Sequence, residues 1–335
     1  MDDGPVVRDK TSPLGILLSD SVHAGFGGRI EDMAAQAGIP AVCHALGNAP
    51  RKELIHIAFF SRDLYEGSSL RKPGPLSDAF FSVVDHAPCL RWLHVFSSGL
   101  DLPQYAPSLR RGIRITGSKG VTAMPIAQTA VAAILALSRG FGHWLPAQQR
   151  RQWSPLTGSE RPRDICDQHA LVIGVGPIGF RIAHMLKSVG YRVTGVRRRP
   201  QPLAPLDNVI AFESLDAVLP HCDWLVLAVP LSPSTRHLVD ARRLGLLAPH
   251  AFMANVARGE LVDEQALVAA LKAGRLRGAY LDTFAEEPLP AESALWGLPN
   301  VWITPHNSAA SQGHEKRVID CFLEEYAAWL GASHY

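Results

Sequence analysis

Short apolar runs and amphipathic stretches alternate along most of the chain. The first third contains four runs typical of buried strands, LGILLSD, ELIHIAFFS, LRWLHVFSS and GIRITGS. Stretches such as RIEDMAAQAG and LSDAFFSVVDHA lie between them and have the spacing of amphipathic helices. This alternation predicts an α/β fold in which helices cover both faces of a parallel sheet.

A second series of apolar runs begins at Ala170, after an Ala-rich stretch at 123–138 and a Pro- and Arg-rich connection. Its runs are ALVIGVG, YRVTGVR, WLVLAVP, AFMANVA, GAYLDTF and VWITPH. The Ala-rich stretch contains Gln128 and is shorter than the ~20 residues that a membrane span needs, so we interpret it as a buried helix. Two series of strands predict two domains, for which 335 residues suffice.

Composition narrows the class of protein. Hydrophobic residues make up 47% and charged residues 19%, as in folded globular proteins. The 33 basic and 31 acidic residues leave a net charge of +2 spread along the chain, which gives no reason to expect a nucleic-acid or membrane surface. Five scattered cysteines and an N-terminus without a signal-peptide pattern favour a cytoplasmic protein with free thiols.

Three glycines in G-x-G-x-x-G spacing follow the first strand of the second series. They are Gly174, Gly176 and Gly179, and they open a helical pattern that ends at Gly190. In a dinucleotide-binding unit the first glycine permits a tight turn, the second lets the backbone approach a pyrophosphate, and the third allows close packing. The helix start offers unpaired N–H groups to the phosphates. The alternative is a plain strand-to-helix turn with incidental glycines.

The next strand of this series ends on basic residues, in VTGVRRRP at 193–200. In dinucleotide-binding units this strand normally ends on an acidic residue that binds the ribose hydroxyls, and here that position is Arg197. A carboxylate would repel a 2′-phosphate, whereas a guanidinium pairs with it bidentately. We therefore predict that the protein prefers NADP(H) over NAD(H), with Arg197 and Arg198 binding the phosphate. Alternatively, the arginines only solvate the strand end.

Three later motifs carry candidate catalytic side chains. NVARGELVDEQAL contains Arg258, LDTFAEEPLP contains Asp282 and Glu287, and NVWITPH ends on His306. All follow apolar strands, so we expect them at the carboxyl edge of one parallel sheet, where open α/β sheets bind ligands. Taken singly, each residue has an ordinary explanation in a loop or on the surface. Together, behind a dinucleotide-binding turn, they favour an oxidoreductase.

These motifs resemble those of the D-isomer-specific 2-hydroxyacid dehydrogenases. The resemblance spans nearly the whole chain and is strongest at 171–310, where it rests on GVGPIG, LAVPLSPSTRHLV, the segment from NVARGE to EEPLP, and LPNVWITPH. It implies a Rossmann dinucleotide-binding domain inserted into a flavodoxin-like substrate domain. The expected substrate domain comprises 1–119 and 308–335, and the expected NADP-binding domain comprises 120–307.

The resemblance also implies catalytic roles. His306 would donate a proton to the keto oxygen of a 2-keto acid, and Glu287 would hydrogen-bond the imidazole. Arg258 would polarise the keto group and bind the carboxylate. Asp282 would hold the nicotinamide amide. Glu286 competes with Glu287, but the family's motif places the acidic residue directly before the proline.

Further contacts follow from the resemblance. VFSSGLD, which ends at Asp101, is similar to the family's substrate loop, so the N–H groups of Ser98 and Gly99 would bind the carboxylate. Arg62 in FFSRDLY is either a substrate contact or an exposed loop arginine. Gln128 stands where the family usually has Glu, and PHNSAAS departs from the commoner glycine-containing version. The expected cofactor contacts outside the basic strand end and Asp282 are Gly174, Gly176, Pro177, Ile178, Gly179, Val229, Pro230 and Thr235.

The expected function is NADPH-dependent reduction of a small 2-keto acid such as glyoxylate or hydroxypyruvate to a D-2-hydroxy acid. The expected enzyme has no metal, places its active site in the cleft between the domains, and forms a homodimer through the cofactor domain. Two alternatives stay open. One is NAD-linked oxidation of a D-2-hydroxy acid, and the other is a dinucleotide-sensing interaction protein, as in a corepressor branch of the family.

Overall fold

The computed structural model describes residues 12–48, 51–68, 72–100 and 102–332. The chain divides into two compact units. Unit 1 comprises Met1–Val121 and Ser311–Tyr335, and unit 2 comprises Thr122–Ala310. The functional assignment of the units as substrate and cofactor domains stays a prediction at this point.

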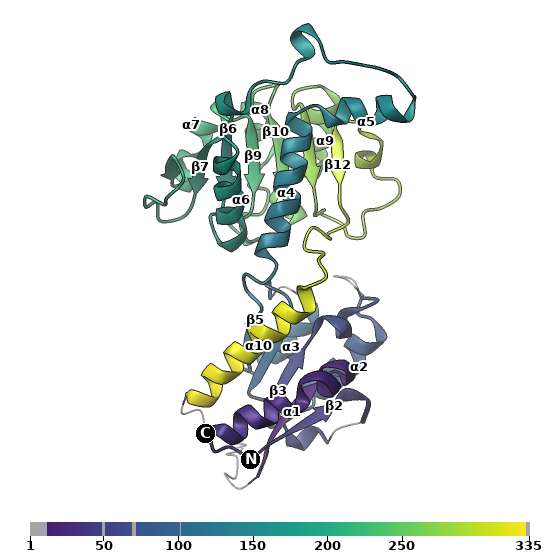
Figure 1. The fold of residues 1–335 in the computed structure, drawn as a ribbon, viewed down its shortest axis with the longest axis vertical. Coiled ribbons are helices and arrows are strands. Elements are labelled where there is room, and N and C mark those ends of the chain that lie inside the picture. The colour runs from purple at the N-terminus through teal and green to yellow at the C-terminus, as the bar shows by residue number, and fades with distance from the viewer. Residues whose placement is uncertain (1–11, 49–50, 69–71, 101, 333–335) are drawn as a thin grey trace. The chain divides into compact units, whose positions relative to one another are not determined.

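Unit 1 is built on a five-stranded parallel sheet of order β2-β1-β3-β4-β5, the flavodoxin-like order (Figure 1). Its strands are β1 (Leu14–Leu18), β2 (Ala41–Ala45), β3 (Ile55–Phe60), β4 (Trp92–Val95) and β5 (Arg114–Gly117). Its helices are α1 (Asp20–Gln36), α2 (Pro75–Val84), α3 (Ala106–Arg110) and, from the end of the chain, α10 (His314–Gly331).

Aromatic side chains fill both faces of the unit 1 sheet. Phe59 of β3 stacks on Phe322 of α10 with ring centroids 4.4 Å apart. The next residue, Phe60, points to the opposite face and meets Phe81 of α2 at 4.8 Å. The last helix therefore completes the core of the unit in which the chain begins, with buried side chains at Val318, Ile319, Phe322, Leu323, Tyr326 and Trp329.

Unit 2 is built on a seven-stranded parallel sheet of order β12-β11-β10-β9-β6-β7-β8, in which the order reverses between β6 and β9 as in Rossmann folds. Its strands are β6 (His169–Ile173), β7 (Arg192–Val196), β8 (Asn208–Ile210), β9 (Trp224–Leu227), β10 (Phe252–Asn255), β11 (Gly278–Leu281) and β12 (Val301–Ile303). Its helices are α4 (Ala123–Ser138), α5 (Phe141–Gln149), α6 (Pro177–Ser188), α7 (Leu215–Val218), α8 (Ala241–Leu246) and α9 (Glu264–Lys272).

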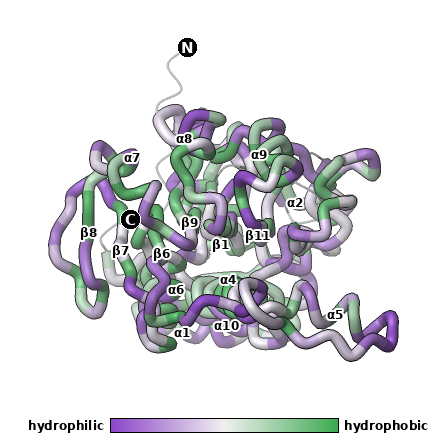
Figure 2. Tube along the Cα trace, turned by 90° about the horizontal axis from the view of Figure 1, so that it is seen from above, coloured by the Kyte–Doolittle hydropathy of each residue, from purple (hydrophilic) through white to green (hydrophobic). Residues whose placement is uncertain are grey.

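Helices cover both faces of the unit 2 sheet, so its strands are hydrophobic on both sides. In β6, Ala170 and Val172 pack with α4 and α6, whereas Leu171 and Ile173 pack with α7, α8 and α9. The colouring by hydropathy shows β6 and β9 in hydrophobic green (Figure 2). Double burial explains why these strands appear in the sequence as continuous apolar runs rather than as alternating patterns.

The predicted α/β fold, a Rossmann unit inserted into a flavodoxin-like unit, is confirmed. The sequence pattern missed two edge strands, β2 and β8. β2 has a partly exposed AVCHA pattern, and β8 is three residues long with no fully buried side chain. Edge strands lack one neighbour and part of the hydrophobic cover, which weakens their signal in the sequence.

The Ala-rich stretch forms α4, whose buried face belongs to the core of unit 2 as expected. Among the described helices, none by itself is long and apolar enough to cross a membrane. By length and composition alone, α4 and α5 pass that test only as a pair, and the two are bent by 78° relative to each other.

The buried His94 of β4 makes the stability of unit 1 depend on pH. Its Nδ1 lies 2.8 Å from Thr116 Oγ1 and its Nε2 lies 3.1 Å from Ser118 Oγ. Burial lowers the pKa of His94 from 6.5 to about 4. The His94 imidazole is therefore protonated near pH 6.5 in the unfolded chain, but only near pH 4 in the folded chain.

We expect His94 to lower the free energy of unfolding by about 2 kcal/mol between pH 7 and pH 5. Urea unfolding of the wild type and of His94→Gln at both pH values measures this contribution. The variant cannot gain the imidazole proton, so its loss of stability over the same interval should be smaller by about that amount. Equal losses in both proteins would contradict the assignment.

Candidate active site

The glycine-rich turn joins β6 to α6 at the carboxyl edge of the unit 2 sheet. Gly174 has φ +90°, and a Cβ there would lie 2.7 Å from Ala228 O and from Val229 Cα. A Cβ at Gly179 would lie 1.8 Å from the carbonyl oxygen of Gly174. Gly176 precedes the first turn of α6, and a Cβ there would meet no described atom within 4 Å. Gly174 and Gly179 are thus required by packing, whereas Gly176 leaves the helix start open to a phosphate.

Arg197 and Arg198 follow the end of β7. The Arg197 side chain is partly buried and Arg198 is exposed. In the part of the chain that the structure describes, neither guanidinium has a hydrogen-bond or ion-pair partner. The following loop is anchored by Asp207, which accepts a 2.7 Å hydrogen bond from Val193 N and pairs with Lys187. Since neither cation has a counter-ion among the described residues, both are available to an anion at this strand end.

Thr235 closes the loop that follows β9. Its buried hydroxyl accepts a hydrogen bond from Ser232 N and donates one to Pro230 O, both at 2.8 Å. This loop begins beside the glycine turn, because Val229 lies against Gly174. The structure therefore gives Thr235 a role in shaping the loop, and the direct cofactor contacts of Val229, Pro230 and Thr235 stay predictions.

His306 and Glu287 form a hydrogen-bonded pair. His306 Nδ1 lies 2.7 Å from Glu287 Oε2, and the other carboxylate oxygen accepts a 3.0 Å hydrogen bond from Phe284 N. The Glu287 side chain is 14% exposed and the imidazole is 36% exposed. Among the described residues, none hydrogen-bonds His306 Nε2. The carboxylate thus fixes the ring through one nitrogen and leaves the other for a ligand.

Asp282 holds the turn that carries His306. Its Oδ1 accepts hydrogen bonds from Thr304 Oγ1 at 2.6 Å, Asn307 N at 3.0 Å and Ser308 N at 3.1 Å. Its Oδ2 accepts from the Ser308 hydroxyl. The carboxylate is 2% exposed. His306 has φ +50°, which is uncommon for a residue with a Cβ and therefore needs such support.

Thr304 and Ser308 are site residues that sequence reasoning missed. The signal was present in TPHNS, where a hydroxyl stands two residues before and two after the histidine. Their hydrogen-bond acceptor is Asp282, which follows β11 and lies 22 residues before Thr304, so the local sequence does not reveal the pairing. The predicted nicotinamide contact of Asp282 stays a prediction, and both oxygens of that carboxylate already accept internal hydrogen bonds.

Arg258 lies on the loop after β10. Its Nη1 donates a 2.7 Å hydrogen bond to Ala257 O, and its own carbonyl accepts one of 2.9 Å from Asn255 Nδ2. The next residue, Gly259, packs against the backbone of the loop after β11, since a Cβ there would lie 1.9 Å from Phe284 C. The loops after β10 and β11 therefore meet backbone to backbone.

The order of the strands brings the predicted catalytic residues together. β10, β11 and β12 are neighbours in the sheet, so their carboxyl ends present the loops of Arg258, Glu287 and His306 side by side. The glycine turn after β6 lies at the same edge, beyond β9. Among the residues described, no three His, Cys, Asp or Glu side chains form a group that could hold a metal ion.

The predicted substrate-binding residues lie together at the carboxyl edge of unit 1. The Arg62 guanidinium is 5.5 Å from the ring centre of Tyr65 and 5.4 Å from that of Phe96. Phe96 leads directly into the turn at Ser97, whose hydroxyl donates a 2.7 Å hydrogen bond to Gly99 O. Arg62 is therefore a neighbour of the predicted carboxylate-binding turn rather than an isolated loop arginine.

Two backbone N–H groups of this turn donate no hydrogen bond to a described residue. Ser98 donates its hydroxyl to Ser118 O at 3.1 Å, which fixes the turn against β5. No described residue accepts a hydrogen bond from the backbone N–H groups of Ser98 or Gly99. Free N–H groups beside a guanidinium suit a carboxylate. Asp101, the last residue of the motif, lies outside the described residues.

Comparison with known proteins agrees with this geometry. Residues 131–308 match the family described as D-isomer specific 2-hydroxyacid dehydrogenase, NAD binding domain. The glyoxylate reductase of Thermococcus gammatolerans is 35% identical over 256 residues, which cover 74% of this chain and 75% of the relative. The chain belongs to the D-isomer specific 2-hydroxyacid dehydrogenase family.

Other members of this 2-hydroxyacid dehydrogenase family extend the comparison. Glyoxylate/hydroxypyruvate reductase B of Yersinia enterocolitica is 30% identical over 259 residues, covering 77% of this chain and 78% of the relative. The structure of a D-isomer specific 2-hydroxyacid dehydrogenase from Xanthobacter autotrophicus, in complex with NADPH and MES, is similar with a TM-score of 0.71 and 26% identity. The match covers 97% of this chain and 96% of that one. The protein is therefore an NAD(P)-dependent oxidoreductase of this family.

The contact at Gly259 generates a testable expectation for this dehydrogenase. Gly259→Ala should push the loops of Arg258 and Glu287 apart, because the added Cβ would overlap the Phe284 backbone. We expect a loss of about 2 kcal/mol or more in stability and a fall in kcat/KM of about tenfold or more. Thermal unfolding and steady-state kinetics measure the two effects.

Gly245→Ala is the matched control. Gly245 lies in α8, is exposed, and a Cβ there would meet no described atom within 4 Å. Because Ala is the better helix former, this change should raise stability by about 0.5–1 kcal/mol and leave activity unchanged. Wild-type stability and activity in Gly259→Ala would show that the two loops are not held by this contact.

Proposed function

We propose that the protein reduces small 2-keto acids such as glyoxylate and hydroxypyruvate to D-2-hydroxy acids, with NADPH as the preferred donor. The preference for NADPH is supported by the strand end at Arg197 and Arg198, where two guanidinium groups have no counter-ion among the described residues. In dinucleotide-binding units this strand end contacts the adenosine ribose. The relatives named glyoxylate reductase and glyoxylate/hydroxypyruvate reductase support the choice of substrates.

The residues of unit 2 fit a dinucleotide. The open helix start at Gly176 offers the N–H groups of α6 to a pyrophosphate, and Pro177 and Ile178 form the first turn of that helix. Arg197 and Arg198 would pair with a 2′-phosphate. When bound, the cofactor supplies the hydride. Groups of the protein itself would bind the substrate and transfer the proton.

Substrate binding needs a counter-charge for the carboxylate. In unit 1 we assign it to the Arg62 guanidinium together with the N–H groups of Ser98 and Gly99, from which no described residue accepts a hydrogen bond. Arg62 stacks on two aromatic rings and has no described carboxylate partner, so its charge is available. Arg258 also places positive charge where the keto oxygen becomes negative during reduction.

His306 is the proposed proton donor to the keto oxygen through Nε2. Glu287 Oε2 lies 2.7 Å from Nδ1 and fixes the orientation of the ring, which leaves Nε2 for the substrate. Asp282 keeps the ring in place by holding the His306 turn, so it is proposed as a positioning residue for the acid. In the opposite direction the same pair would accept the proton.

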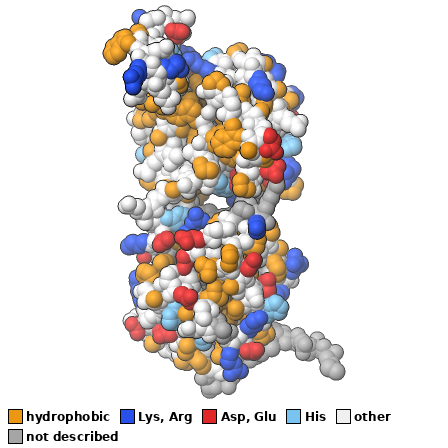
Figure 3. Space-filling model, turned by 90° about the vertical axis from the view of Figure 1, so that its right-hand side faces the viewer, with side chains coloured by type: hydrophobic (Ala, Val, Ile, Leu, Met, Phe, Trp, Pro, Cys, Tyr) orange, Lys and Arg blue, Asp and Glu red, His pale blue; other side chains and the backbone are white. Residues whose placement is uncertain are grey.

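We propose a homodimer formed through unit 2. Figure 1 shows α5 and the segment after it standing out from the rest of unit 2, and Figure 3 shows hydrophobic side chains at the outer end of that region. Trp153 is 97% exposed, and three large apolar side chains of α5 are also exposed, Phe141, Trp144 and Leu145. Apolar groups gathered in this way mark interaction surfaces. Light scattering of the purified protein tests the dimer, and a monomer at micromolar concentration would contradict it.

The cofactor preference is tested by fluorescence titration with NADPH and NADH. In a double variant, Arg197→Ala with Arg198→Ala, we expect the affinity for NADPH to fall by about tenfold to a hundredfold, since charge-assisted bidentate contacts to phosphate are lost. The affinity for NADH, which lacks the 2′-phosphate, should change by less than about threefold. Arg199→Ala, an exposed neighbour in the same run, is the control. Equal affinity of the wild type for both cofactors would mean that the arginines only solvate the strand end.

The reaction is tested by mixing protein, NADPH and glyoxylate or hydroxypyruvate and following absorbance of the cofactor. His306→Gln should reduce kcat by about a hundredfold or more, because it removes the acid, and should leave NADPH affinity unchanged. Glu287→Gln should reduce kcat less, because Glu287 acts by orienting the imidazole. Near-normal turnover in His306→Gln would exclude this residue as the acid. Tight NADPH binding by the wild type without turnover of either keto acid would favour the dinucleotide-sensing alternative.

A further inference from the structure

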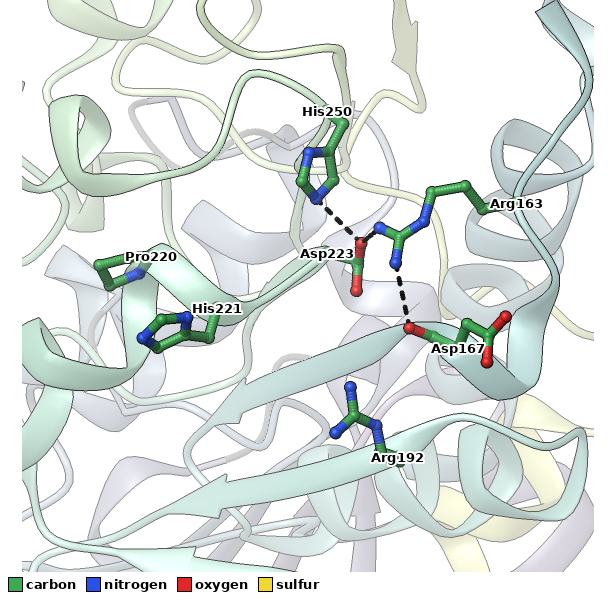
Figure 4. A pocket seen from close by; sticks show the side chains of 7 residues that line it. All are labelled: Arg163, Asp167, Arg192, Pro220, His221, Asp223 and His250. Atoms are coloured by element: carbon green, nitrogen blue, oxygen red, sulfur yellow. Dashed lines mark hydrogen bonds and ion pairs between the residues drawn. The ribbon is translucent and has the colours of Figure 1, made fainter. Parts of the chain in front are cut away.

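A cavity of about 630 Å³ lies at the amino edge of the unit 2 sheet, opposite the edge that carries His306 and the glycine turn (Figure 4). Its lining residues come from the segments before β6, β9 and β10 and from the first residue of β7. Strands of a parallel sheet all begin at one edge, which explains why these segments meet. The lining residues are Arg163, Asp167, Arg192, Pro220, His221, Asp223 and His250.

A buried carboxylate organises this cavity. Asp223 Oδ2 accepts a 2.8 Å hydrogen bond from His169 N. Its Oδ1 accepts from Arg163 Nη1 and lies 3.2 Å from His250 Nε2. The second terminal nitrogen of Arg163 donates to the carbonyl oxygen of Asp167 at 3.2 Å. The negative charge of Asp223 is therefore already matched by Arg163.

After this pairing, the positive charge of Arg192 is not matched by a described carboxylate. The Arg192 guanidinium and the His221 ring have no hydrogen-bond or ion-pair partner among the described residues. In Figure 4, Arg192 extends toward Asp223 from below, while the Asp167 carboxylate points away from both. The cavity thus contains two arginines and two imidazoles around a single inward-facing carboxylate. Such an arrangement favours an anion.

We propose that this cavity binds the phosphate group of a small phosphorylated metabolite. A guanidinium presents a planar fork of donors that suits a phosphate, and Arg163 is held in place for this by Asp223. The volume exceeds that of a bare ion and lies in the range of small-molecule sites. The site is separate from the proposed dinucleotide site, because it lies at the opposite edge of the same sheet.

Isothermal titration calorimetry with glycerol 3-phosphate, in a buffer without phosphate, tests the proposal. Arg192→Gln should weaken binding by about tenfold or more, since it removes a cavity arginine that has no counter-ion among the described residues. Arg192 is exposed and its strand contacts are made by the backbone, so the variant should fold. The matched control is Arg275→Gln, an exposed arginine after α9 that does not line the cavity.

A third protein, the double variant at Arg197 and Arg198, separates this site from the cofactor site. Binding retained there and in Arg275→Gln, but weakened in Arg192→Gln, would support the proposal. A parallel titration with inorganic phosphate shows which ligand the site takes. If inorganic phosphate binds more weakly than glycerol 3-phosphate, the ligand is a phosphorylated metabolite. Equal binding supports the site with free phosphate as its ligand. The proposal is overturned if Arg192→Gln binds like the wild type, if Arg275→Gln loses as much, or if binding disappears in the double variant.

Discussion

Parallel pairing of β10, β11 and β12 is the constraint on which the site depends. Strands that run in one direction end at one edge, and the residues that follow them must share it. Arg258, Glu287 and His306 are separated by tens of residues in the chain, and the sheet places them on adjoining loops. No single one of these loops would hold the arrangement alone. The close approach at Gly259 adds a second restraint, because the loops of Arg258 and Glu287 then meet backbone to backbone.

Hydrogen bonds to a buried carboxylate stabilise the turn that carries His306 at this edge. The Asp282 carboxylate is removed from water, and four hydrogen bonds from the His306 turn replace its hydration. The strained backbone of His306 is one cost of the arrangement, and these hydrogen bonds offset it. The result is an imidazole fixed from two sides, by its backbone and by Glu287. A fixed acid supports the proposed transfer of a proton to a keto oxygen.

The charged side chains at the opposite, amino edge of the same sheet are arranged differently. At the carboxyl edge, Asp282 holds the His306 turn and Glu287 holds its imidazole, and Arg258 is the proposed counter-charge for the substrate. At the amino edge Asp223 is matched by Arg163, and Arg192 remains without a described partner. Surplus positive charge costs stability unless a solvent ion or ligand accompanies it, which is the physical basis for proposing an anion there. A ligand at that edge would leave the catalytic loops free.

The sequence by itself determined the α/β class, the glycine turn and the position of Arg197, because each depends on neighbours within a few residues. It also placed the candidate catalytic residues at one edge, since a strand and the loop after it are contiguous. Other features were decided by tertiary structure alone. They include the edge strands β2 and β8, the hydrogen bonds of Asp282 to Ser308, and the meeting of Arg163 with Asp223. These depend on contacts between distant segments, and a side chain's partner is then set by how the sheet and helices pack rather than by local sequence.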